Sequence, residues 1–158
     1  MAMPEGDDRL VRTHFLAGWW LLLVFVALGT TLEAFHGLKV GFYLDLGNAT
    51  RRLMWTLAHA HGVLLGLLNI AFAVTVQSRG MPPDKARIAS ASLLGASVLL
   101  PGGFLLGGIV VYGGDPSPGV LLTPAGAALL LVSVLLVLRS IGRRKPEPEK
   151  PLRQGKRR

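Results

Sequence analysis

Residues 53–76 read LMWTLAHAHGVLLGLLNIAFAVTV, and no Asp, Glu, Lys or Arg occurs among them. An α-helix rises about 1.5 Å per residue, so about 20 apolar residues cross the roughly 30 Å hydrocarbon core of a bilayer. The length of this uncharged run therefore predicts a helix that spans a membrane.

Three further runs have the same character, and short polar segments separate them. The chain has 158 residues, of which 51% are hydrophobic and only 16% are charged, well below the proportion of a soluble domain. We therefore expect an all-α, four-helix transmembrane bundle within residues 14–141. The predicted helices cover about residues 15–35, 52–77, 87–112 and 119–140.

The flanking segments and the positive charges predict how the bundle is oriented. Residues 1–13 are expected to form a cytoplasmic segment and residues 142–158 a disordered basic tail. With the amino terminus inside, 14 of the 17 Lys and Arg residues lie on the inner side. Both termini should then be cytoplasmic, in a multi-pass protein of a bacterial inner membrane. The tail should attract anionic lipid, and no specific binding to nucleic acid is expected.

The connecting segments carry weaker patterns. Apolar residues alternate with polar ones over residues 38–46, which is typical of a short strand or an interfacial segment within a loop at 36–50. Thr50 is a candidate N-cap for the second helix. Pro101 should kink the third helix, because it lacks an N–H and crowds the carbonyl of Ser97. The chain has no cysteine, which excludes disulfides and thiolate sites.

Polar side chains inside the second helix are the main functional signal, because such groups are costly in a membrane and normally face other helices. His59, Gly62, Gly66, Asn69 and Ala73 follow one another at intervals of three and four residues, so they form one stripe. Gly62 and Gly66 form a small-xxx-small pair that lets another helix approach closely. We expect this stripe to be packed against a neighbouring helix.

His61 lies about 160° around the helix from His59, since each residue advances about 100°. One metal ion therefore cannot take both imidazoles from the same helix, and the sequence assigns neither a metal site nor a catalytic residue. Either histidine is a candidate to bind a cofactor such as haem or to relay protons, and hydrogen bonding to neighbouring helices is the structural alternative. Glu33 and Asn69 are the further candidates for proton handling. His36 and His14 are expected in the two membrane interfaces, and His14 is expected to lack partners.

The segment from Leu57 to Leu65 resembles the second transmembrane helix of haem–copper oxidase subunit I. That helix carries a T-x-H-G-x-x-M type stretch in which the histidine ligates the low-spin haem, and His61-Gly62 would be the match. Leu65 stands near the position where the family has Met. The resemblance covers about 20 residues and implies haem at His61. It does not imply a complete oxidase, because the third and fourth helices contain no histidine.

The chain is also similar in outline to hydroxylaminobenzene mutase, a small four-helix membrane protein with an A-H-x-x-G pattern. Ala58, His59 and Gly62 match that pattern, whereas Asn69 is not followed by Gly as it is there. This resemblance implies a small membrane isomerase that uses His59, His61 and Asn69. The third hypothesis is a non-catalytic assembly or interaction subunit, either in a homo-oligomer or in a larger membrane complex.

Overall fold

The computed structural model describes residues 5–44 and 49–141, and the predicted tail at 142–158 lies outside these residues. The fold is all-α except for one two-stranded hairpin, which confirms the predicted four-helix bundle. The elements are α1 (Glu5–Gly37), α2 (Gly41–Leu44), α3 (Ala49–Arg79), α4 (Pro83–Gly107), β1 (Val111–Tyr112), β2 (Asp115–Pro116), η2 (Pro118–Leu121) and α5 (Leu122–Ile141). The four longer helical segments are long and apolar enough to cross a membrane.

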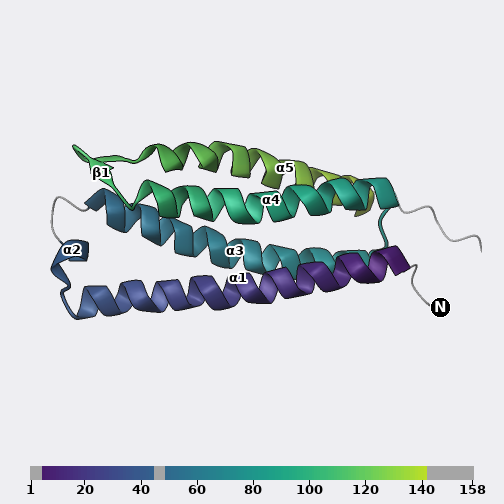
Figure 1. The fold of residues 1–158 in the computed structure, drawn as a ribbon. Coiled ribbons are helices and arrows are strands. Elements are labelled where there is room, and N and C mark those ends of the chain that lie inside the picture. The colour runs from purple at the N-terminus through teal and green to yellow at the C-terminus, as the bar shows by residue number, and fades with distance from the viewer. Residues whose placement is uncertain (1–4, 45–48, 142–158) are drawn as a thin grey trace, which may run out of the picture.

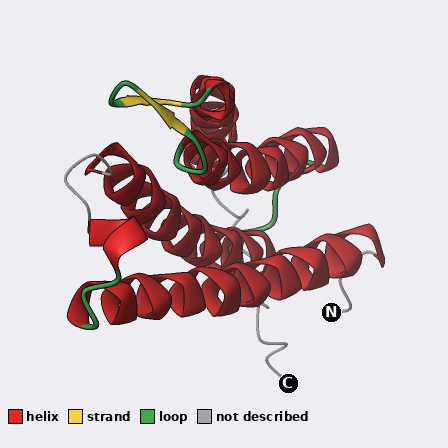
Figure 2. Cartoon of the chain, turned by 60° about the vertical axis from the view of Figure 1, so that its left-hand side comes forward, coloured by secondary structure: helices red, strands yellow, loops and turns green. Residues whose placement is uncertain are grey.

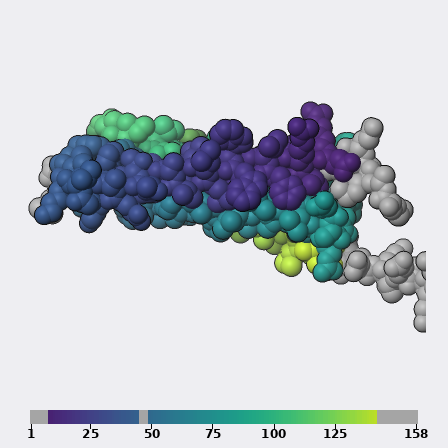
Figure 3. Space-filling view, turned by 90° about the horizontal axis from the view of Figure 1, so that it is seen from below, coloured from purple at the N-terminus to yellow at the C-terminus, as the bar shows by residue number. Residues whose placement is uncertain are grey.

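The long helices pack in series. Helix α1 lies along α3, α3 contacts α4, and α4 contacts α5 (Figure 1). The same order is visible in the rotated view of Figure 2, where the hairpin projects beyond one end of the bundle. We call this the hairpin end and the opposite one, where α1 begins, the N-terminal end. Seen from the side of α1, this helix runs along the length of the molecule, and parts of the other elements are visible along its edges (Figure 3).

Glycines allow close contacts between helices at two places in the bundle. A Cβ atom placed on Gly66 of α3 would lie 3.0 Å from the carbonyl oxygen of Gly18 on α1. On the other side of the bundle, a Cβ atom on Gly126 of α5 would lie 2.6 Å from the backbone nitrogen of Leu100 on α4. The buried stripe of α3 includes Gly62, Gly66, Asn69 and Ala73, as its spacing predicts.

The first and third helices differ in extent from the prediction. Helix α1 begins at Glu5 instead of near residue 15, and its polar first turns contribute the buried Val11 to the core. Helix α4 ends at Gly107 instead of near residue 112. The Ser117 hydroxyl donates to the carbonyl of Leu106 at 2.7 Å, and the Ser117 N–H donates to Gly107 at 3.0 Å. The chain after Gly107 thus supplies hydrogen bonds that another helical turn would otherwise provide.

The connection between the first two long helices is also different. His36 lies in the last turn of α1, and residues 41–44 form the short helix α2 instead of a strand. Phe42 and Tyr43 of α2 pack against Phe35, with ring centroids 5.4 Å and 5.9 Å away. In a helical turn these successive side chains are about 100° apart, whereas a strand would direct them to opposite faces. The Thr50 hydroxyl donates to the carbonyl of Gly114 and does not cap α3.

Both described ends of the chain lie at the N-terminal end of the bundle (Figure 1), and their cytoplasmic location stays a prediction from charge. Reporter fusions at residue 45 and at residue 158 should therefore report opposite sides of the membrane. A periplasmic phosphatase paired with a cytoplasmic fluorescent reporter would measure this. Fusions that report the same side would contradict the predicted orientation of the four spans.

Candidate functional site

Two groups of polar side chains lie inside the bundle, at different heights along α3. The first lines a groove of about 390 Å³ between α1, α2 and α3, towards the hairpin end, which we call the His59 groove. Its lining residues are Val26, Gly29, Thr30, Leu32, Glu33, His36, Tyr43, Thr56 and His59. The second is mostly buried and joins α1, α3 and α4 through His14, Asn69, Ser90 and Ser97, which we call the His14 cluster.

His59 is held by the backbone of α1. Its Nδ1 atom lies 2.6 Å from the carbonyl oxygen of Phe25. Because a carbonyl oxygen only accepts, Nδ1 carries the proton and donates it. The ring fits here because α1 has a glycine opposite, since a Cβ atom on Gly29 would collide with the imidazole. In turn, the ring of Phe25 occupies the space above Gly62.

The second ring nitrogen of His59 is open to the groove. Among the described residues no hydrogen-bond partner of Nε2 is recorded, and no buried side-chain nitrogen or oxygen there lacks a partner. It follows that Nε2 is accessible. With Nδ1 protonated, Nε2 of the neutral ring is a lone pair that accepts a hydrogen bond, takes up a proton or binds a metal.

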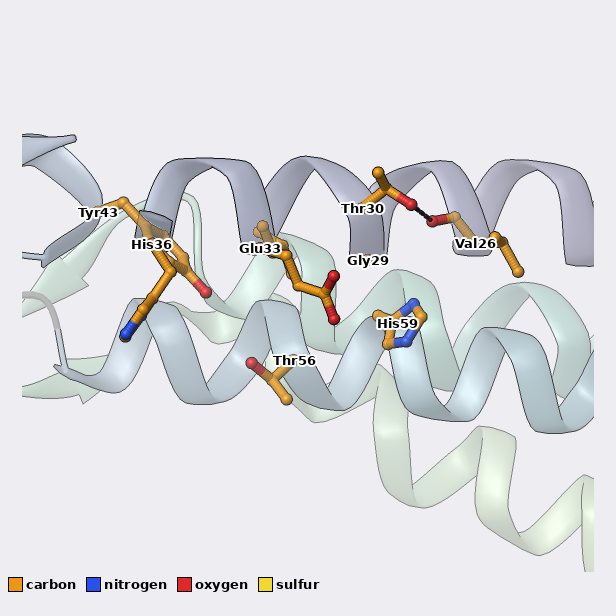
Figure 4. Close-up of a pocket in the computed structure, with 9 residues that line it drawn as sticks. Val26, Gly29, Thr30, Glu33, His36, Tyr43, Thr56 and His59 are labelled. Carbon is orange, nitrogen blue, oxygen red and sulfur yellow. Dashed lines mark hydrogen bonds between the residues drawn. The ribbon is translucent and has the colours of Figure 1, made fainter. Parts of the chain in front are cut away.

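Glu33 reaches into the same groove from α1. Its carboxylate extends towards α3 between Thr56 and His59 (Figure 4). Glu33 lies one turn beyond Gly29, which is about 6 Å along the helix axis. The groove thus combines an open imidazole nitrogen with a carboxylate, a pair suited to general acid–base chemistry.

Two arginines at the start of α3, Arg51 and Arg52, donate to backbone carbonyls at the hairpin end. Arg51 donates to Phe42, Gly108 and Ile109 at 3.1–3.3 Å. Arg52 donates to Tyr43 at 2.9 Å. Neither arginine lines the His59 groove.

His61 faces a different helix, as its angular separation from His59 predicts. Its ring centroid lies 5.0 Å from that of Phe104 on α4. Its Nδ1 atom donates to the carbonyl of Leu57 at 2.8 Å, one turn back along α3. His61 therefore also keeps Nε2 open. Because the two histidines face different helices, they do not bind one ligand together.

His14 is the site residue that sequence reasoning placed wrongly. It was expected in an interface without partners, whereas it is fully buried and contacts Asn69 and Ser90. Nδ1 lies 2.6 Å from Asn69 Oδ1, and Nε2 lies 2.8 Å from the Ser90 hydroxyl. A signal was present in the sequence: Ser90 and Ser97 are seven residues apart, so they lie on one face of their helix.

The partners in the His14 cluster determine which atom donates and which accepts in each hydrogen bond. The Asn69 amide nitrogen donates to the carbonyl of Leu65 at 2.8 Å and to the Ser97 hydroxyl at 2.9 Å, so Oδ1 is the acceptor for His14. Nδ1 of His14 is therefore the protonated nitrogen, and Nε2 of the neutral ring accepts from Ser90. Each polar atom has a partner, so this cluster connects α1, α3 and α4 through hydrogen bonds.

Asn69, a candidate for proton handling on the sequence, thus belongs to the His14 cluster. It lies ten residues from His59, or about 15 Å along α3. Between the two groups α3 presents Leu65 and the two stripe glycines, all buried. The structure places Glu33 and His59 together and Asn69 apart from them.

The donor set for a metal ion is sparse. Within residues 8–44 and 49–141, no group of three or more His, Asp or Glu side chains is arranged to hold a metal ion. His36 and His59 line the same groove, but His36 lies seven residues beyond Gly29, or about 10 Å further along α1.

Searches with protein-family models, against curated proteins and against solved structures find no match to this chain.

Proposed function

We propose that this multi-pass membrane protein binds a small molecule in the His59 groove and exchanges protons with it through His59 and Glu33. One observation carries the proposal: the Phe25 carbonyl fixes the proton on Nδ1 of His59, which leaves Nε2 open beside the Glu33 carboxylate. A histidine so oriented has a defined tautomer and a defined ring position, as general bases in enzymes do.

The reaction class that fits this pair is an isomerisation. Such a reaction needs one group that removes a proton and another that returns it at a different atom, and the substrate and product have the same composition. The similarity of residues 58–62 to hydroxylaminobenzene mutase points in the same direction. In the conversion of hydroxylaminobenzene to aminophenol the N–O bond breaks, the hydroxyl oxygen bonds to a ring carbon, the proton of that carbon leaves and the nitrogen gains a proton. We assign His59 as the base that takes the ring proton, and Glu33 as the carboxylate that receives this proton from His59 and returns it to the nitrogen.

Turnover of hydroxylaminobenzene to its isomer aminophenol tests this assignment. The purified protein in detergent should catalyse the conversion, and His59→Gln and Glu33→Gln should each lower the rate by about 10²-fold or more, the usual contribution of a general acid or base. The matched control is His61→Gln, which changes the same residue type on the opposite face of α3 and should retain the rate. Absence of turnover by the wild type, measured by chromatography of the product, would contradict the proposed reaction.

The second candidate is haem binding at His61, the position selected by the resemblance to haem–copper oxidase subunit I. Its supporting observation is the hydrogen bond from Nδ1 to Leu57, because haem-ligating and metal-ligating histidines commonly donate their other N–H to a carbonyl. Haem would supply redox or ligand-binding chemistry, and this chain would provide one axial imidazole. A Soret band that is lost in His61→Ala but kept in His59→Ala would favour this candidate over the first.

The remaining expectations concern the location of the protein in the cell and its partners, and they are proposals. We infer a location in a bacterial inner membrane, with the basic tail against anionic lipid on the cytoplasmic side. Membership of a homo-oligomer or of a larger membrane complex also stays a proposal. Helix α5 is suited to such a contact, because Gly126 and Ser133 are the only residues of α5 that are buried in the described part of the chain.

A further inference from the structure

The polar groups of the His59 groove differ between its two ends. Towards the membrane centre lie the open Nε2 of His59 and the Glu33 carboxylate, both acceptors. Thr30 adds a third acceptor, because its hydroxyl proton is already donated to the carbonyl of Val26 at 3.0 Å (Figure 4). This end of the groove therefore offers three acceptors against one lining hydroxyl donor, that of Thr56.

The charges around the groove are equally one-sided. Glu33 is the one carboxylate that lines it, and the titratable groups that face it are His36 on α1, Tyr43 on α2 and His59 on α3. The nearby guanidinium groups of Arg51 and Arg52 lie against backbone carbonyls of the hairpin end. No Lys or Arg lines the groove, so Glu33 is its one lining residue with a formal negative charge.

We propose that the His59 groove selects small organic amines, with the N–H groups of the ligand directed at Glu33 and His59. An ammonium group supplies three donors and a positive charge, which complement three acceptors, one of them the Glu33 carboxylate. The apolar body of the ligand then lies against Val26 and Leu32. This inference gives a ligand class to the site of the proposed function and rests on that assignment.

A comparison of three probes with the same ring tests the selectivity. Benzylamine is a cation at neutral pH, benzyl alcohol is neutral and benzoate is an anion. We expect the purified protein to bind benzylamine at least about tenfold more tightly than benzyl alcohol, since a hydrogen bond between charged groups is worth more than a neutral one. Benzoate should bind more weakly than either. Ligand-observed NMR in detergent micelles measures the three dissociation constants.

Variants connect the selectivity to the groove. Glu33→Gln keeps the shape of the side chain and lies at an exposed position, so the fold should persist while the preference for benzylamine over benzyl alcohol disappears. Asp115→Asn is the matched control, because Asp115 is an exposed carboxylate of the hairpin that does not line the groove, and it should leave all three constants unchanged. Equal affinities for benzylamine and benzyl alcohol in the wild type would overturn the inference, as would an unchanged preference in Glu33→Gln.

The outcome is separable from that of the proposed reaction. Turnover of hydroxylaminobenzene without any preference for amines would overturn the ligand class and leave the acid–base assignment standing. Selectivity for benzylamine that depends on Glu33, without turnover, would support the ligand class and overturn the isomerisation.

Discussion

Asn69→Ala is expected to lower the free energy of unfolding by about 2–3 kcal/mol, because the amide makes two hydrogen bonds to other helices inside the bundle, each worth up to about 1.7 kcal/mol in a membrane protein. One of these bonds accepts from His14 and the other donates to Ser97. Without the amide, the Nδ1–H group of His14 is buried without an acceptor. Titration of the purified protein with SDS in mixed micelles measures the loss.

A double-mutant cycle separates this network from simple loss of packing. If His14 and Asn69 stabilise the bundle through each other, His14→Ala combined with Asn69→Ala should be less destabilised than the two single losses together, by about 0.5–3 kcal/mol. Thr75→Ala is the control on the same helix, because the Thr75 hydroxyl bonds only to the carbonyl of Ala71 within α3, and it should change stability little. Additive losses would show that the His14 cluster does not act as one unit.

Gly66→Leu is the second substitution with a large expected effect on stability. The first added carbon would lie 3.0 Å from both the Gly18 carbonyl oxygen and the Leu22 side chain, and three further carbons would follow. Backbone cannot move aside as a flexible side chain can, so α1 and α3 must separate. Overpacking of this kind costs about 1–3 kcal/mol, although leucine favours a helix more than glycine does.

Leu67→Ala is the matched control for this substitution. Leu67 is adjacent to Gly66 in the chain but 53% exposed, so the change removes carbons from the surface and should have a small effect. SDS titration again measures both variants. A Gly66→Leu protein as stable as the wild type would mean that α1 and α3 do not approach each other closely at this position.

The stripe on α3 shows how far sequence periodicity leads at the candidate site. The spacing of Gly62, Gly66 and Asn69 predicts a packed face, and these residues are buried in the structure. The angular argument also separates His59 from His61. Spacing does not identify the residue on the neighbouring helix that contacts a side chain of the stripe. His59 is oriented by the carbonyl of Phe25, which lies 34 residues earlier in the chain.

His14 and α2 show where local patterns are misleading. His14 has a polar flank in the sequence, which favours an interface, but its partners Asn69 and Ser90 lie 55 and 76 residues away. Residues 38–46 alternate as a strand would, but residues 41–44 form a helical turn whose aromatic rings pack on Phe35 of α1. Contacts of Phe42 and Tyr43 with Trp55 on α3, 6.4 Å between centroids in both pairs, are available to a helical turn.

The sequence by itself determined the four spans, because the length of an apolar run and the rise of a helix are local quantities that need no knowledge of neighbours. It also determined which face of the second long helix is packed. Only the tertiary structure decided that His59 shares a groove with Glu33 while Asn69 joins His14. The physical reason is that a buried polar group takes whichever partner the helix packing brings within hydrogen-bond distance, and that choice depends on how residues far apart in the chain are aligned.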